Sequence, residues 1–568
     1  MPSSTLKPQP KPGDVPGARL ETTVTMLAGL ALLIGIYWFF SAQLYGGYLL
    51  IRDDPANIGG TMQGGLYGWL TKGMAGYYHV YPEWPQPGFS NFYRPAWNLI
   101  IFVEKTTFGS SYWIWFLVFC ALQYFGAFLF LRVQRILGVP PRPALIFAML
   151  FLFNPAFVNL GFVYPGFQFD VFVSLVLLAA LHQLLEYRFG TALALITAAV
   201  FTKETAIFAP VAAAITVFIL KRDPKWSVAM LAPLLVWVGA RLLAYHAVMG
   251  GTFASPANSG ELFSNIVKGL AVWPTGAVSG SFLAQTAGAS NIALPAFQLV
   301  NAALWVILAY AAFQVAREFW RSPQKTESKL QAVLLVWTLG ALTFCMLTRP
   351  QTRFGAIFYV FLLLFLACFL FAQARPGYLR LLPIFILSLV TLARGDDFLR
   401  HAITNGTLER RGETALFNGL RALPQDGRTV LVANAPTMLS APVFLSKSWD
   451  LKLNVIFADQ VHGCTHAKAG DVRYDLSTTS LLVGIPPCAY YVFAGVPEDI
   501  QSKLLVGDFR RPGIGVYGFP GHPIGKRASS GDIDFGRALQ IRFERPPGTV
   551  LAYDWQGGAY RVLTSGSR

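Results

Sequence analysis

Two adjacent carboxylates, Asp53 and Asp54, follow directly on the first long apolar stretch of the chain, residues 24–50. About 20 helical residues cross the hydrocarbon core of a bilayer, so this stretch is long enough to span one. An acidic pair just outside a spanning helix is typical of a small group of membrane enzymes and transporters. The alternative is structural: Asp54 precedes Pro55 and could cap a helix, with Asp53 as its solvated neighbour.

Further charged residues lie near the ends of other predicted spans, on the same side of the membrane. They are Asp170, Lys203, Glu204, Arg349 and Arg353. Ionised groups at membrane depth are costly, so they are candidate site residues by default. The cations suit a phosphate, to which Arg offers paired donors and Lys a point charge. Together, the acids and cations would suit an anionic ligand that carries a polyol.

Each of these residues also has a structural alternative. Asp170 could cap its helix. Lys203 and Glu204 could pair with each other or extend their charged ends to the membrane interface. Arg349 and Arg353 could anchor their spans to lipid headgroups.

The composition is that of a membrane protein. Of the 568 residues, 54% are hydrophobic and 13% are charged, whereas soluble domains carry about 25% charged residues. The net charge of +16 could indicate nucleic acid, but Lys and Arg lie in short segments between apolar runs. That distribution is the pattern of membrane topology. We therefore expect a lipid bilayer, and no nucleic acid, as a partner.

The apolar runs predict eleven spans. They are 24–43, 113–131, 143–161, 169–185, 190–202, 206–220, 227–247, 292–315, 332–347, 355–373 and 378–394. The segments between them alternate in Lys and Arg content, and the positive-inside rule places the richer set in the cytoplasm. The outer side then receives the first loop, 44–112, the turn at 202–205 and the chain beyond residue 394.

The predicted fold class is a polytopic α-helical membrane protein with a C-terminal soluble α/β domain. Residues 1–23 form a cytoplasmic tail, 24–394 the transmembrane domain and 395–568 the extracytoplasmic domain. In this last part the apolar runs shorten to strand length, and two helices are expected. The strands are 429–432, 453–458, 490–494, 539–543 and 549–553, and the helices are 413–423 and 436–447.

Cys464 and Cys488 are the only cysteines of the C-terminal part. In an oxidising compartment we expect them to form a disulfide, and otherwise to be a free pair. His462 and His466 flank Cys464, but one short cluster is a poor zinc signature. The sequence holds no Gly-rich phosphate loop and no Gly-x-Ser-x-Gly elbow, which speaks against nucleotide-driven catalysis.

Three signatures resemble the GT-C superfamily of integral-membrane glycosyltransferases. They are the early acid of the first outer loop, Phe-Tyr-Arg-Pro at 92–95 followed by Phe-Gly at 108–109, and Thr-Lys-Glu at 202–204. The resemblance covers residues 25–395, and the C-terminal part resembles the outer domains appended to such enzymes.

The resemblance implies an inverting glycosyltransferase of the plasma (inner) membrane. It would move a hexose or pentose from a polyprenyl-phosphate-linked sugar donor to a glycan, lipid or protein acceptor at the outer face. The implied catalytic acids are Asp53 or Asp54 as the base and Asp170 as the second acid. The implied donor and phosphate contacts are Arg94, Lys203, Glu204, Arg349 and Arg353. No cofactor is assigned, because some relatives hold a divalent metal ion by paired acids and others use none.

Apart from the resemblance, the chemistry of such a transfer requires two kinds of group. Inversion needs a base that takes a proton from the acceptor hydroxyl. It also needs cations that hold the departing phosphate, whose charge grows as the glycosidic bond breaks. Two alternatives stay open: a transporter or flippase of a lipid-linked anion, whose charges would lie nearer the membrane midplane, and a non-catalytic assembly subunit.

Overall fold

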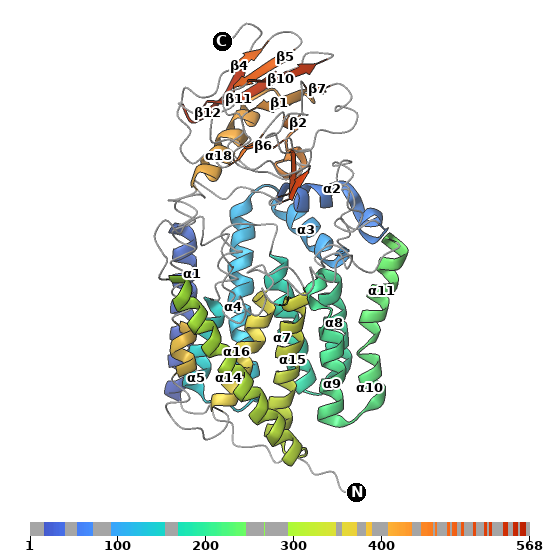
Figure 1. The fold of residues 1–568 in the computed structure, drawn as a ribbon, viewed down its shortest axis with the longest axis vertical. Helices are drawn as coiled ribbons and strands as arrows, with labels where there is room; N and C mark the ends of the chain where they lie inside the picture. The colour runs from blue at the N-terminus through green and yellow to red at the C-terminus, as the bar shows by residue number, and fades with distance from the viewer. Residues whose placement is uncertain are drawn as a thin grey trace.

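The computed structural model describes residues 16–39, 54–71, 93–153, 168–245, 266, 293–347, 355–371, 382–388, 407–433 and 445–457, and short segments, mostly strands, between 460 and 563. The described helices form a bundle, and a smaller part built of strands and a helix sits on one end of it (Figure 1).

The bundle and its outer layer are built from thirteen described helices. They are α1 (Pro16–Phe39), α2 (Asp54–Thr71), α3 (Pro95–Phe108), α4 (Tyr112–Ile136), α5 (Pro141–Leu152), α7 (Phe169–Leu185), α8 (Phe189–Thr202), α9 (Ala209–Lys221), α10 (Pro224–Ala229), α11 (Ala232–Tyr245), α14 (Ala293–Arg321), α15 (Thr326–Leu347) and α16 (Gly355–Phe371). Among the described residues, five helical segments are long and apolar enough to cross a membrane, and five shorter helices are also apolar. The chain is therefore an integral membrane protein, and the total of eleven spans stays a prediction.

Burial follows the position of each helix in the bundle. Helix α16 is central, because its residues from Ala356 to Leu370 are all buried, and it packs on α15, α5 and α7. Helix α11 lies at the periphery, where Leu235, Val236 and Leu243 are exposed. An apolar face of this kind suits contact with lipid tails.

The basic segments gather at the end of the bundle away from the strand-rich part (Figure 1). Here α4 ends near Arg135, α7 turns into α8 at Arg188, α9 ends before Arg222 and α14 ends at Arg321. Tight turns close this end, since Tyr187 and Arg222 have left-handed φ angles of 61° and 55°. The grouping agrees with the alternation expected from charge, and which compartment each end faces stays a prediction.

The segment predicted as the first outer loop contains two helices, α2 and α3, which pack on each other near the strand-rich part. Helix α2 is interrupted at Gly65, whose φ of 60° and ψ of 175° are not helical. Helix α3 buries one face, which includes Trp97, Ile101 and Glu104. Together the two helices form a layer between the bundle and the C-terminal part.

The C-terminal part contains a four-stranded mixed sheet in the order β12, β11, β1, β2. Its strands are β1 (Thr429–Ala433), β2 (Asn454–Phe457), β11 (Thr549–Asp554) and β12 (Ala559–Leu563). Strand β1 is parallel to both β2 and β11, and β12 is antiparallel to β11. Helix α18 (Thr407–Ala422) packs on β12 and β11, at a close approach where a Cβ on Gly419 would lie 3.1 Å from Cβ of Tyr560.

The remaining described strands form a second sheet and two pairs. The second sheet has the order β4, β5, β10, β7, and the pairs are β3 with β6 and β8 with β9. Their bounds are β3 (Gln460–His462), β4 (Tyr474–Leu476), β5 (Ser480–Gly484), β6 (Tyr490–Val492), β7 (Leu504–Val506), β8 (Val516–Phe519), β9 (His522–Ile524) and β10 (Ala538–Phe543).

The secondary structure expected for the C-terminal part accounts for some of these elements, and β3, β4, β5, β7, β8, β9 and β12 were not expected. The five expected strands overlap β1, β2, β6, β10 and β11, and the first expected helix, 413–423, overlaps α18 up to Ala422. Of the second, 436–447, the described portion is the short helix α19 (Leu445–Ser448). Cys464 and Cys488 lie outside the described residues, so their bridge stays a prediction.

Candidate functional site

Four of the residues singled out from the sequence meet in a buried charge cluster. Lys203 forms an ion pair with Asp170, and both side chains are 1% exposed. Arg94 binds Glu204 through two donors, with Nε 3.0 Å and Nη2 2.8 Å from Oε2. Paired and hydrogen-bonded charges are the form in which proteins tolerate ionised groups in the interior.

A break between α8 and α9 positions Lys203 and Glu204, two of the four residues of this cluster. Lys203 has φ −159° and ψ 142°, so the backbone is extended at the end of α8, before the short 3-10 helix Glu204–Ala206. Successive side chains of an extended backbone point to opposite sides. Lys203 can therefore reach Asp170 on α7 while Glu204 reaches Arg94 at the start of α3.

Each residue of the Tyr-Arg-Pro run at 93–95 has a structural role. The Tyr93 hydroxyl donates to the carbonyl of Leu70, 3.0 Å away, and so ties α3 to α2. Arg94 is the N-cap residue of α3. Pro95 begins the helix, where its fixed φ is favourable and its missing N–H costs nothing.

An aromatic ring joins the two ion pairs. The Lys203 ammonium lies 4.5 Å and the Arg94 guanidinium carbon 4.9 Å from the centroid of the Phe169 ring. The Phe169 ring meets Trp97 of α3 edge to face at 5.2 Å. Because a cation is attracted to the face of an aromatic ring, Phe169 stabilises both cations and links α7 to α3.

Arg241 is a fifth charged residue of this region, beyond those predicted from the sequence. It is fully buried on α11, its guanidinium lies 4.9 Å from the Trp237 ring, and its charge acts on the Glu204 carboxylate. Among the described residues, this region thus holds three cations, Arg94, Lys203 and Arg241, and the two carboxylates of Asp170 and Glu204. An arginine within the apolar run 227–247 was the available signal, because such charges in spans are rare.

The other predicted site residues are described only in part. Asp54 is the first residue of α2, and Pro55 follows it. Asp53, Arg349 and Arg353 lie outside the described residues, so their roles stay predictions. Within the described part of the chain no group of three His, Cys, Asp or Glu side chains could hold a metal ion.

Glu104 is a buried carboxyl group that no sequence pattern indicated. Its side chain lies on the buried face of α3, and its Oε2 has no hydrogen-bond partner among the described residues. Burial raises the pKa of Glu104 from 4.5 to about 8. The folded protein therefore holds a proton here that the unfolded chain releases near its ordinary pKa.

This raised pKa predicts a pH-dependent stability. Between about pH 4.5 and 8 the folded state binds the extra proton, so stability falls as pH rises through that window. Glu104→Gln removes the ionising group and should raise the free energy of unfolding at pH 8.5 by roughly 2–4 kcal/mol, with little change at pH 5. Thermal unfolding in detergent at pH 5 and at pH 8.5 measures this change in stability. Exposed Glu327→Gln is the control, and an equal effect of Glu104→Gln at both values would contradict the prediction.

No protein-family model matches the sequence, and no curated protein is significantly similar to it. Among solved structures, the apo crystal structure of the Archaeoglobus fulgidus oligosaccharyltransferase aligns with a TM-score of 0.39 and 14% identity, over 72% of this chain and 62% of that one. The archaeal oligosaccharyltransferase AglB from Archaeoglobus fulgidus, in complex with an inhibitory peptide and a dolichol-phosphate, aligns with a TM-score of 0.39 and 11% identity, over 76% and 64%. The chain thus spans less than two thirds of the length of either structure. These likenesses are distant.

Proposed function

We propose that the chain is an inverting membrane glycosyltransferase that moves a sugar from a polyprenyl-phosphate carrier to an acceptor at the outer face. The observation that supports this most is the buried cluster of Arg94, Lys203 and Arg241 with two carboxylates. Its three cations suit the phosphate of the donor. One member of the cluster, Arg94, lies at the start of α3. Helix α3 packs on α2, which begins at the proposed catalytic residue Asp54.

In the proposed reaction, Asp53 or Asp54 takes the proton of the acceptor hydroxyl. The hydroxyl oxygen bonds to the anomeric carbon, and the bond from that carbon to the phosphate oxygen breaks with its electron pair on the phosphate. The cations stabilise the charge that develops there. Low dielectric around buried groups strengthens such interactions, so a buried cluster suits this role.

The donor phosphate would compete with carboxylates that hold the cations in this structure. Lys203 is bound by one oxygen of Asp170, and the second, Oδ2, has no hydrogen-bond partner among the described residues. A phosphate that reaches Lys203 would share it with Asp170. Arg349 and Arg353 remain proposed as additional phosphate contacts.

The tight burial of both ion pairs also favours a second candidate function, a non-catalytic subunit in which the cluster only holds helices together. Asp170, Lys203 and Glu204 are each at most 1% exposed, as in a structural ion-pair network. The two functions differ in what the chain does to the donor, since a subunit of this kind leaves it intact.

Mass spectrometry of surface glycans, glycolipids and glycoproteins tests the proposal in cells with and without this chain. We expect one sugar to be lost when the chain is absent, and its polyprenyl-phosphate donor to accumulate. A chain that carries Asn at both 53 and 54 should fail to restore the sugar. Restoration by that variant would favour the assembly subunit, and an unchanged glycan profile without the chain would contradict both functions in glycan synthesis.

A further inference from the structure

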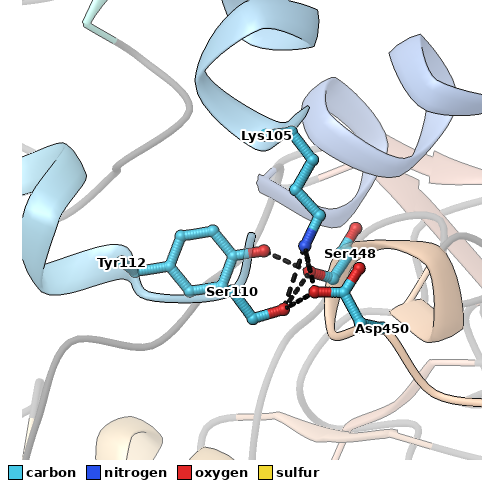
Figure 2. Close-up of polar contacts among 5 residues, drawn as sticks. All are labelled: Lys105, Ser110, Tyr112, Ser448 and Asp450. Atoms are coloured by element: carbon cyan, nitrogen blue, oxygen red, sulfur yellow. Dashed lines mark hydrogen bonds and ion pairs between the residues drawn. The ribbon is translucent and has the colours of Figure 1, made fainter. Parts of the chain in front are cut away.

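A compact set of polar contacts joins the C-terminal part to the junction of α3 and α4 (Figure 2). Lys105 Nζ donates to the Ser448 carbonyl oxygen at 2.6 Å and to Asp450 Oδ2 at 2.9 Å. The Tyr112 hydroxyl donates to the same carbonyl oxygen. We call the five residues Lys105, Ser110, Tyr112, Ser448 and Asp450 the latch.

The donors and acceptors of the latch match in number. The Lys105 ammonium has three N–H donors, and its third acceptor is Ser110 Oγ at 2.9 Å. Ser110 has a single hydrogen, and its Oγ lies 2.5 Å from Asp450 Oδ2 and 3.2 Å from the Ser448 carbonyl oxygen. The shorter contact takes that hydrogen, because hydrogen bonds to carboxylates are shorter and stronger. All three lysine donors are thus satisfied across the contact.

The latch is anchored on both sides. Trp449, between its two C-terminal members, is fully buried, and its ring meets Phe417 of α18 edge to face at 5.2 Å. Asp450 has a left-handed φ of 55°, which turns the chain after α19. On the other side, Gly109 has a φ of 57° and lets the chain turn from α3 into α4. A Cβ at Gly109 would lie 3.8 Å from Asp450 Oδ2, so the two turns approach closely.

The latch joins a buried charge to a half-exposed one. The Lys105 side chain is 2% exposed and that of Asp450 is 52% exposed. Burial lowers the pKa of Lys105, whereas Asp450 acts in the opposite direction. Without Asp450 an ammonium would be left buried with no carboxylate, which is strongly unfavourable. Without Lys105, Asp450 could stay hydrated, so the two losses are unequal.

The latch adjoins the layer of α2 and α3. Lys105 lies on α3, which begins after Arg94, and α19 contacts α2, which begins at Asp54. We propose that the latch fixes the C-terminal part on this layer and that its side chains are positioning residues for the transfer, an assignment that rests on the proposed function. They would act by fixing the position of the C-terminal part relative to Asp54, the first residue of α2.

Hydrogen exchange of the full chain in nanodiscs tests the latch without reference to activity. Asp450→Asn should speed exchange about 100-fold in segments 105–115 and 445–452, and leave β1 of the C-terminal sheet protected. Lys105→Met should have a smaller effect. The double variant, which removes both charges, should restore protection about tenfold or more relative to Asp450→Asn. Asp426→Asn, at an exposed ion pair of the same part, is the matched control.

Unchanged exchange in Asp450→Asn would overturn the latch. If exchange in β1 of Asp450→Asn also becomes faster, the double variant separates the two explanations. Restored protection in the double variant supports the latch, and continued fast exchange overturns it.

Transfer assays on the same samples test the positioning role. Asp450→Asn should lower kcat about tenfold with unchanged donor Kd. Normal transfer with an open latch would overturn that role alone. A wild-type chain that transfers no sugar would overturn the proposed function and the positioning role, while the exchange data would still judge the latch.

Discussion

Asn at both 53 and 54 should lower sugar transfer about 10²- to 10⁴-fold, the usual loss when a general base is removed. The side chains keep their size, but neither can accept the proton of the acceptor hydroxyl. Of the two single variants we expect Asp54→Asn to have the larger effect, because Pro55 restrains the backbone next to it. Donor binding should stay unchanged, because the proposed phosphate contacts lie on other residues. Single-turnover transfer and donor titration on the purified protein measure the two quantities separately.

A second Asp-Pro pair provides a matched control. Asp223 precedes Pro224 and α10 at the opposite end of the bundle, and its side chain accepts from the backbone N–H groups of Lys225 and Trp226. It is therefore an ordinary helix cap, the structural alternative considered for Asp54. Asp223→Asn should leave transfer unchanged. If the variant with Asn at both 53 and 54 also transfers at the parent rate, the first loop is not catalytic.

The elements that the sequence predicted well are those whose apolar residues decide the structure locally. Helix α16 comes from one uninterrupted apolar run, and β1 from a short run of β-branched and aliphatic residues between polar segments. Helices α2 and α3 were not predicted. Glycines lower helix propensity along α2, one of them at a kink, and α3 mixes charged residues into its buried face. Both helices depend on packing against each other and on the bundle.

The candidate site was predicted as a set of residue types and not as a set of contacts. Lys203 and Asp170 are 33 residues apart, and Lys105 and Asp450 of the latch, which were not predicted, are 345 apart. Composition and periodicity carry no information on pairing at such separations. The pairing of Lys203 depends on its extended backbone between two helical segments.

The second large effect is expected from the buried pair of Asp170 and Lys203. Either Asp170→Asn or Lys203→Met leaves one buried charge without its partner and should lower the free energy of unfolding by roughly 3–5 kcal/mol. The double variant removes both charges with little change in volume. It should recover much of that loss, because the desolvation cost of the pair disappears with it. Thermal unfolding of the parent chain and all three variants in one detergent gives a double-mutant cycle for this pair. The same cycle on the exposed pair of Lys325 and Glu327 is the control.

Donor binding separates the structural part of this pair from the functional part. If Lys203 contacts the carrier phosphate, the double variant should fold and yet bind the donor about tenfold or more weakly, since a charge-assisted contact is worth roughly 1.5–3 kcal/mol. If the pair is only structural, donor binding should recover together with stability. Recovery of both would therefore remove Lys203 from the phosphate site. Recovery of stability alone would identify Lys203 as a residue that both holds α8 to α7 and binds the donor.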